Sequence, residues 1–305
     1  MNSMNVPNSA TIAVGTVLAG LADQIADLTP QMRKAATYVL ENPNDVGVSS
    51  IREIAEAADV KPNTLIRMAR SVGFDGYEGF REPFREEIRQ GGASFPDRAR
   101  WLQSLQQSGK LGGLYADMVS STFRNIEDTF GNIAEKDLID AASTIWNSRQ
   151  VFTLGVGVNN ANARNFSSLA STGMTLFHAI PRAGSTPVDD LAWADQRDVL
   201  IAITCKPYRA EVLAAVQIAR EQGMKVIGIS DSPASPIIIG SAYGFVVSSD
   251  TPQFFPSSVS TIALLETLLS FVIALASPGI VARVEKFHQR RHQLGVYRDE
   301  AEVPT

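Results

Sequence analysis

The sequence predicts a protein of two domains, an all-α domain followed by an α/β domain with a five-stranded parallel sheet flanked by helices. Before residue 150 the apolar residues recur with helical spacing, whereas from Gln150 onward short runs rich in Val and Ile alternate with helical stretches. The chain has 305 residues, of which 45% are hydrophobic and 19% are charged. A globular chain of this length is long enough for two substantial hydrophobic cores.

The composition limits the compartment and the partners that we expect. The single cysteine, Cys205, excludes an internal disulfide and fits a reducing cytoplasm. The first residues lack the basic start of a secretory signal, and the longest apolar run, 262–276, is interrupted by Glu266 and is too short to span a bilayer. We therefore expect a cytoplasmic protein with no membrane partner. A net charge of −5 argues against a protein that coats nucleic acid without specificity.

The N-terminal part of the chain predicts a mobile tail over residues 1–15 and a small helical domain over 16–90. Thr29-Pro30 opens a helix over 31–41, which Asn42-Pro43 stops. The end of this domain supplies aromatic side chains that we expect to pack back on its helices: Phe74, Tyr77, Phe80 and Phe84.

Residues 50–72 predict two short helices that meet at a tight turn, which is the pattern of a helix-turn-helix. Ser50 can cap the first helix. Ala55 is small where two helices crossing steeply leave no room for a longer side chain. Asp59 stands at the turn, where a left-handed backbone is needed, and Pro62 suits the first position of the second helix. Apolar residues fill the buried side of the pair: Ile51, Ile54, Ala58, Val60, Leu65, Met68, Ala69 and Val72.

The other face of the second helix is cationic and able to form hydrogen bonds, and no acidic residue interrupts it. It carries Lys61, Asn63, Thr64, Arg67 and Arg70. A helix with a packed back and such a front suits the major groove of DNA. Residues 30–90 contain nine Lys or Arg and ten Asp or Glu, so any positive potential must come from their arrangement on one face. The alternative is an ordinary helical hairpin whose cations are only solvated.

A helical connector over 91–130 and an α/β domain over 131–280 follow, with a C-terminal helix and tail over 281–305. Helices are predicted at about 97–107, 113–130 and 135–147. Strands are predicted at 151–155, 174–180, 198–204, 224–230 and 243–249, with helices at about 159–172, 187–196, 208–222 and 257–276. Strands that alternate with helices in this way build parallel βαβ units.

In such a sheet, small ligands bind beyond the carboxyl ends of the strands, near the starts of the following helices. The residues that this rule selects are Gly155, Gly157, Asn159, Thr204, Lys206, Arg209, Ser230, Ser257 and Ser258. Together they offer helix-start amides, hydroxyls and two cations, which favours a small anion. The glycines are not the dinucleotide fingerprint, because a third glycine is missing, and no cofactor is expected. The bland alternatives are a tight strand–helix turn at the glycines and solvated cations at Lys206 and Arg209.

The remaining reactive side chains predict neither catalysis nor a metal site. His288 and His292 share a helix face, as metal ligands do, but no third ligand is evident, so a solvated C-terminal helix is the preferred interpretation. Cys205 borders the proposed anion site without a nearby histidine, which indicates a packed thiol and not a nucleophile.

With both halves in view, the chain resembles the RpiR family of bacterial transcriptional regulators, which join an N-terminal helix-turn-helix to a C-terminal SIS (sugar isomerase) domain. The first half carries the resemblance in LTPQMRKAATYVLENPNDV and SIREIAEAADVKPNTLIRMARSVGFDGYEGFR. The second half is similar to SIS domains in GVGVNNANA, ADQRDVLIAIT and AAVQIAREQGMKVIGISDSPASPI. The resemblance covers about residues 16–280 and is more specific in the helix-turn-helix.

Two departures from SIS domains bear on the ligand. A serine is usual where this chain has Asn159, and a Ser-x-Ser-Gly-x-Thr loop is usual where it reads TCKPYR over 204–209. Pro207 removes one backbone donor. Either the side chains of Lys206 and Arg209 restore anion binding, or the ligand is not a phosphosugar.

The resemblance and the residues together imply a regulator and not an enzyme. Its expected partners are a double-stranded DNA operator, a small anionic effector (a phosphosugar first, a carboxylate second) and further copies of the chain in a homodimer or homotetramer. The helix 257–276 is the expected contributor to self-association. Two alternatives remain: a sugar-phosphate isomerase with an accessory helical domain, and a module whose cationic helix binds an acidic protein.

Overall fold

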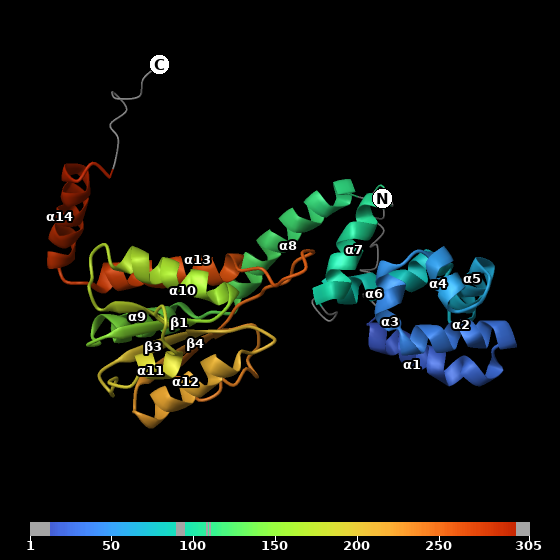
Figure 1. The fold of residues 1–305 in the computed structure, drawn as a ribbon, viewed down its shortest axis with the longest axis horizontal. Helices are drawn as coiled ribbons and strands as arrows, with labels where there is room; N and C mark the ends of the chain where they lie inside the picture. The colour runs from blue at the N-terminus through green and yellow to red at the C-terminus, as the bar shows by residue number, and fades with distance from the viewer. Residues whose placement is uncertain (1–12, 90–94, 108, 110, 297–305) are drawn as a thin grey trace, which may run out of the picture. The chain divides into compact units, whose positions relative to one another are not determined.

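The computed structural model describes residues 13–89, 95–107, 109 and 111–296, which form two compact units (Figure 1). The first unit comprises Met1–Thr122 together with Asp250–Ser257, and the second comprises Phe123–Ser249 and Ser258–Thr305. The first unit is all-α and the second contains a five-stranded sheet, so the predicted fold class is confirmed. The chain enters the first unit twice, which the sequence did not predict.

The first unit holds seven helices among the described residues and the first half of an eighth. They are α1 (Val14–Gln24), the 3₁₀ turn η1 (Ile25–Asp27), α2 (Pro30–Glu41), α3 (Pro43–Val48), α4 (Ile51–Ala57), α5 (Pro62–Ser71), α6 (Tyr77–Arg89), α7 (Phe95–Gln107) and α8 (Leu111–Gly131). Most of the predicted tail lies outside the described residues, but Val14 and Gly15 already belong to α1. Arg33 holds the end of α1 and η1, because its guanidinium donates to the carbonyls of Ile25, Ala26 and Leu28.

The aromatic residues after the helix pair pack on it as predicted. Phe80 lies at the centre, with its ring 5.4 Å from Phe74, 6.1 Å from Tyr77 and 5.3 Å from Phe84. All four rings join the core formed by α1, α2, α4 and α5. Each buried aromatic side chain removes 150–250 Å² from water, so this cluster fixes α6 against the pair.

The second unit contains α9 (Glu135–Trp146), β1 (Val151–Gly155), α10 (Val158–Ala170), β2 (Phe177–Ile180), α11 (Pro187–Asp190), β3 (Val199–Ile203), α12 (Ala210–Glu221), β4 (Lys225–Ser230), β5 (Tyr243–Val246), α13 (Val259–Leu275) and α14 (Gly279–Gln293). All strands are parallel, in the order β2-β1-β3-β4-β5. The chain therefore reverses its direction of strand addition between β1 and β3, which is where such sheets bind ligands.

Alternate side chains of β3 enter two different cores. Val199, Ile201 and Ile203 pack with α9, α10 and α13, while Leu200 and Ala202 pack with α12. Every residue of this strand is buried, because helices cover both faces of a parallel sheet. No single helix in the described ranges is long and apolar enough to cross a membrane, although α13 and α14 pass that test together as a pair bent by 118°.

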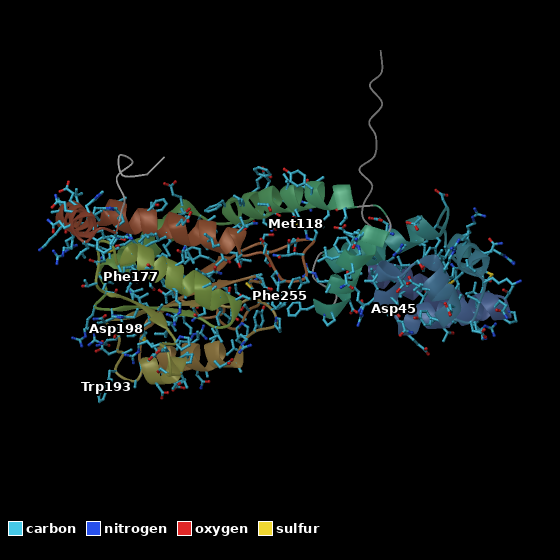
Figure 2. The ribbon with its side chains drawn as sticks, turned by 45° about the horizontal axis from the view of Figure 1, so that its top comes forward. Asp45, Met118, Phe177, Trp193, Asp198 and Phe255 are labelled. Atoms are coloured by element: carbon cyan, nitrogen blue, oxygen red, sulfur yellow. The ribbon has the colours of Figure 1, made fainter. Side chains whose placement is uncertain are left out.

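Two predicted elements are wrong in length. The helix expected over 187–196 ends at Asp190, and Trp193 in the following turn is 93% exposed (Figure 2). The cause is local: the Asp198 carboxylate accepts a hydrogen bond from the Asp195 backbone at 2.9 Å, and such side chains compete with helical hydrogen bonds. The strand expected over 174–180 begins only at Phe177.

Candidate functional site

The helix pair α4–α5 is held by a cap at its start and by a strained residue at its turn. The Ser50 hydroxyl accepts from the Glu53 backbone at 3.3 Å, and the Glu53 carboxylate accepts from the Ser50 backbone at 2.6 Å. These hydrogen bonds lower the pKa of Glu53. Asp59 adopts φ 51°, the left-handed conformation predicted for it, and its carboxylate pairs with Lys34. That pairing lowers the pKa of Asp59, so the carboxylate nearest the start of α5 is neutralised by a cation.

The two faces of α5 differ sharply. Leu65, Met68 and Ala69 are fully buried. On the opposite side Lys61, Asn63, Arg67 and Arg70 are exposed and Thr64 is half-buried. Arg70 is anchored, because its Nε donates to the Asp75 carbonyl at 3.2 Å. The five residues predicted to face DNA therefore lie on one exposed side of one helix whose back is fixed in the core.

The second candidate site is the rim, by which we mean the loops after β1, β3 and β4 and the start of α13. Strand pairing aligns Gly155 with Ile203 and Ile203 with Ile229, so the first three loops begin side by side. Gly155 is required there, because a Cβ atom would lie 2.1 Å from the Asn159 carbonyl oxygen. Gly157 adopts φ 64° and directs the chain into α10, at whose start Asn159 lies.

The hydroxyls of Thr204 and Ser230 are buried parts of the framework. Ser230 Oγ donates to the Thr204 carbonyl at 2.7 Å, and Thr204 Oγ1 accepts from the Arg209 backbone at 3.4 Å. Both residues are 0% exposed. They hold the loop after β3 in place, a role that their position in the sequence did not reveal.

The two rim cations are exposed but have acidic neighbours. The Arg209 guanidinium lies 2.9 Å from the Glu211 carboxylate, and the Lys206 backbone donates to Asp231 at 3.2 Å. An exposed ion pair is worth at most about 1 kcal/mol, so an incoming anion can displace Glu211 from Arg209. Burial and the charge of Asp231 raise the pKa of Cys205 to about 12, so its thiol stays protonated and is not a nucleophile.

The serine pair before α13 is divided between the units. Ser258 is the residue before the first turn of α13, whereas Ser257 is the last residue of the segment 250–257 of the first unit. Sequence reasoning missed three polar groups near the rim residues: the carboxylate of Asp231, and the buried hydroxyls of Tyr208 and Ser260, which have no hydrogen-bond partner among the described residues. Their positions beside predicted site residues were the available signal.

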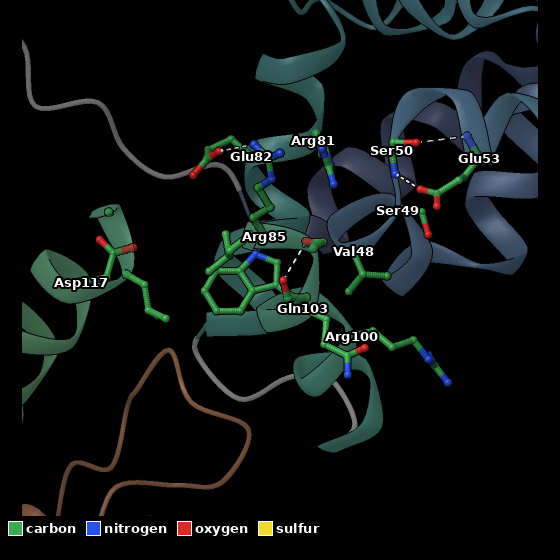
Figure 3. A pocket seen from close by; sticks show the side chains of 15 residues that line it. Val48, Ser49, Ser50, Glu53, Arg81, Glu82, Arg85, Arg100, Gln103 and Asp117 are labelled. Carbon is green, nitrogen blue, oxygen red and sulfur yellow. Dashed lines mark hydrogen bonds and ion pairs between the residues drawn. The ribbon is translucent and has the colours of Figure 1, made fainter. Parts of the chain in front are cut away.

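A cavity of about 680 Å³ lies in the first unit, between α4, α6, α7 and the start of α8 (Figure 3). Its charged lining is already paired. Arg81 donates to the Val46 and Gly47 carbonyls, and Arg85 lies 3.0 Å from Glu78 and 3.5 Å from Glu82. The cavity therefore offers no free charge that would select a ligand.

Comparison with known proteins identifies both halves. Residues 15–91 match the family model of the rpiR-family helix-turn-helix domain, and residues 144–274 match that of the SIS domain. The chain is 22% identical to an HTH-type transcriptional regulator of Caldanaerobacter subterraneus, over 86% of this chain and 90% of that one. It is 21% identical to the HTH-type transcriptional regulator RpiR of Escherichia coli, over 83% of both chains.

The fold as a whole is also that of a solved structure. The Vibrio vulnificus NanR protein, solved in complex with ManNAc-6P, aligns with 92% of this chain and 100% of its own, with a TM-score of 0.55 and 18% identity. The two matched domains, in this order, and the relatives of nearly full length lead to one conclusion: the chain belongs to the RpiR family of transcriptional regulators with a SIS domain.

Proposed function

We propose that this regulator reads a double-stranded DNA operator with α5 and senses a small anionic metabolite, a phosphosugar first and a carboxylate second, at the rim. The observation that carries the DNA part is the exposed cationic face of α5 over a fully buried back. In this proposal Asn63, Thr64 and Arg67 lie nearest the base edges, while Lys61 and Arg70 lie nearer the phosphates.

The DNA contacts are tested by two substitutions with different expected signatures. Arg67→Ala should weaken operator binding by about 1–3 kcal/mol and relax specificity at one base pair. Lys61→Ala should weaken binding to all sequences alike and reduce the slope of log K against log salt by about one. Fluorescence anisotropy with the DNA upstream of the protein's own gene measures both. Lys225→Ala removes an exposed cation of the second unit and is the matched control. Parental binding by both α5 variants would refute the proposal.

Two observations support an anionic effector. The rim presents two exposed cations beside the start of α10, and charge-assisted hydrogen bonds are about twice as strong as neutral ones. A protein of the same fold was solved with ManNAc-6P bound. In this proposal Lys206 and Arg209 bind the anionic group, while Gly155, Gly157, Asn159, Ser257 and Ser258 supply amides, hydroxyls and room; Thr204 and Ser230 support the loop.

A thermal-shift panel of phosphosugars (ManNAc-6P among them), carboxylates and neutral sugars tests the effector class. We expect phosphosugars to raise the melting temperature of the parent and to lose that effect in the Lys206→Ala, Arg209→Ala double variant. Lys225→Ala, again the control, should respond like the parent. Stabilisation by neutral sugars alone, undiminished in the double variant, would exclude this site.

The proposal includes assembly and compartment. One recognition helix contacts too few base pairs for a specific site, so we propose a homodimer or homotetramer that reads an inverted repeat in the cytoplasm. Light scattering with and without DNA measures the assembly, and a monomer at micromolar concentration under both conditions would contradict it.

A further inference from the structure

Helix α8 turns a row of large apolar side chains toward solvent (Figure 1). Leu111, Tyr115, Val119 and Phe123 recur every four residues and are 51%, 78%, 38% and 65% exposed. At 100° per residue, Ile126 and Phe130, both half-buried, continue the same side of the helix. We call these six residues the α8 stripe. Asp117, Arg124 and Asp128 lie on the opposite side, so no charged side chain interrupts the stripe.

The buried side of the same helix is polar. Asn125 and Thr129 are each 1% exposed, and both bind Ser248: its hydroxyl donates to Asn125 Oδ1 and its backbone donates to Thr129 Oγ1, each at 2.9 Å. An amphipathic helix on a monomer has the reverse arrangement, with its apolar side in the core. The polarity of α8 is therefore that of a helix whose outer side meets a partner.

The exposed area is too large to be incidental. The four most exposed side chains present roughly 500 Å² of mostly apolar surface, at the upper end of what a monomer usually shows in one patch. Two copies of the stripe facing each other would bury about 1,000 Å², the minimum for a specific protein interface.

We propose that the α8 stripe is covered by the α8 stripe of a second copy of this chain, packed antiparallel about a two-fold axis near Val119. A row spaced at four residues is a ridge that fits the grooves of an identical row, with an expected crossing angle of about −50°. An apolar, uncharged surface that is complementary to itself suits a copy of itself better than DNA or a charged protein. This inference rests on the proposed function, because reading an inverted repeat requires two recognition helices.

Helix α13, expected from sequence to mediate self-association, is largely used within its own unit. Leu264, Leu265, Leu268 and Val272 are buried in the core beneath the sheet's helical layer. Its apolar residues stabilise the fold, whereas those of α8 contribute little to the core of either unit. The surface available for a second copy is thus on α8.

Cysteine cross-linking tests the pairing directly. In a Cys205→Ser background, Val119→Cys lies near the proposed two-fold axis and should form an intermolecular disulfide under mild oxidation, seen on a non-reducing gel. Arg124→Cys, exposed on the opposite side of the same helix, is the matched control and should not. Equal cross-linking of the two variants, or none of Val119→Cys, would overturn the proposal.

Mass measurement is the second test, and it does not depend on DNA. Phe123→Glu should halve the mass measured by light scattering at micromolar concentration, because it buries a carboxylate in the apolar contact, while Arg124→Glu should keep the parental mass. An oligomer unchanged by Phe123→Glu, or a parent that is monomeric, would overturn the pairing. Anisotropy with the α5 variants is measured separately, so a failure of DNA reading is distinguished from a failure of this interface.

Discussion

Single residues in this protein are held by networks that tolerate little change, and Asp190 shows it best. Its carboxylate is 1% exposed and accepts three hydrogen bonds, from the backbone of Arg182, the guanidinium of Arg182 and the hydroxyl of Ser185, each at 2.7 Å. Burial alone would raise the pKa of Asp190, but the three hydrogen bonds outweigh it and lower the pKa below its usual value of 3.8. The charged form is therefore the one that stabilises the fold.

The pH dependence of Asp190 follows from that sign. Its contribution is fully present above pH 3.8 and is lost as the pH falls through the lowered folded-state value. Asp190→Asn should lower the free energy of unfolding by about 1–3 kcal/mol at pH 7, and the difference should narrow below pH 3.8. Urea unfolding at pH 7 and pH 3 measures it, with the exposed neighbour Asp189→Asn as the control. An equal loss at both pH values would contradict this account.

At the scale of elements, the sequence predicted those features that depend on neighbours in the chain. The cap at Ser50, the left-handed Asp59, the Pro62 start of α5 and the five parallel strands all follow from local rules and were confirmed. It missed what depends on distant partners: the early end of α11, the ion pair of Arg209 with Glu211, and the polar inner side of α8 that binds Ser248. The roles of the individual site residues stay predictions.

The turn between α4 and α5 gives a prediction at this scale. A non-glycine residue in the left-handed region costs about 1 kcal/mol, and the exposed pair with Lys34 offsets only part of that cost. Asp59→Gly should therefore raise the free energy of unfolding of the helix pair by about 0.5–1 kcal/mol, while Asp59→Ala should lower it by a similar amount. Chemical denaturation followed by circular dichroism tests both, and Asp59→Asn serves as the near-neutral control. A less stable glycine variant would show that the ion pair dominates.

On the scale of the whole molecule, the segment 250–257 joins the chain of the second unit to contacts in the first. Arg98 in α7 is 3% exposed and donates to the Thr251 carbonyl, and the ring of Phe95 stacks on Phe255 at 4.3 Å. Burial lowers the pKa of Arg98, whereas the charge of Asp250 raises it. The segment ends at Ser257, immediately before Ser258 of the proposed effector site. Movement of that serine pair would therefore pull on α7.

This continuity predicts an uncoupled variant. Arg98→Met should bind the phosphosugar that gives the largest shift in the panel with nearly parental affinity, yet lose most of the change in DNA affinity that the ligand causes in the parent, typically about 1–3 kcal/mol. DNA titrations with and without the ligand measure the coupling. Arg100→Met on the same helix removes an exposed cation and should keep it. Parental coupling in Arg98→Met would show that the signal takes another route.

The double entry of the chain into the first unit also decides how the gene can be cut. A fragment that stops at Thr122 keeps Arg98 buried but loses the Thr251 carbonyl that it binds, and a buried guanidinium without its acceptor is costly. A fragment that starts at Phe123 carries Phe254 and Phe255 without Phe95 to cover them. Neither half is a clean module, so exchanging halves between such regulators would have to move residues 250–257 together with α7.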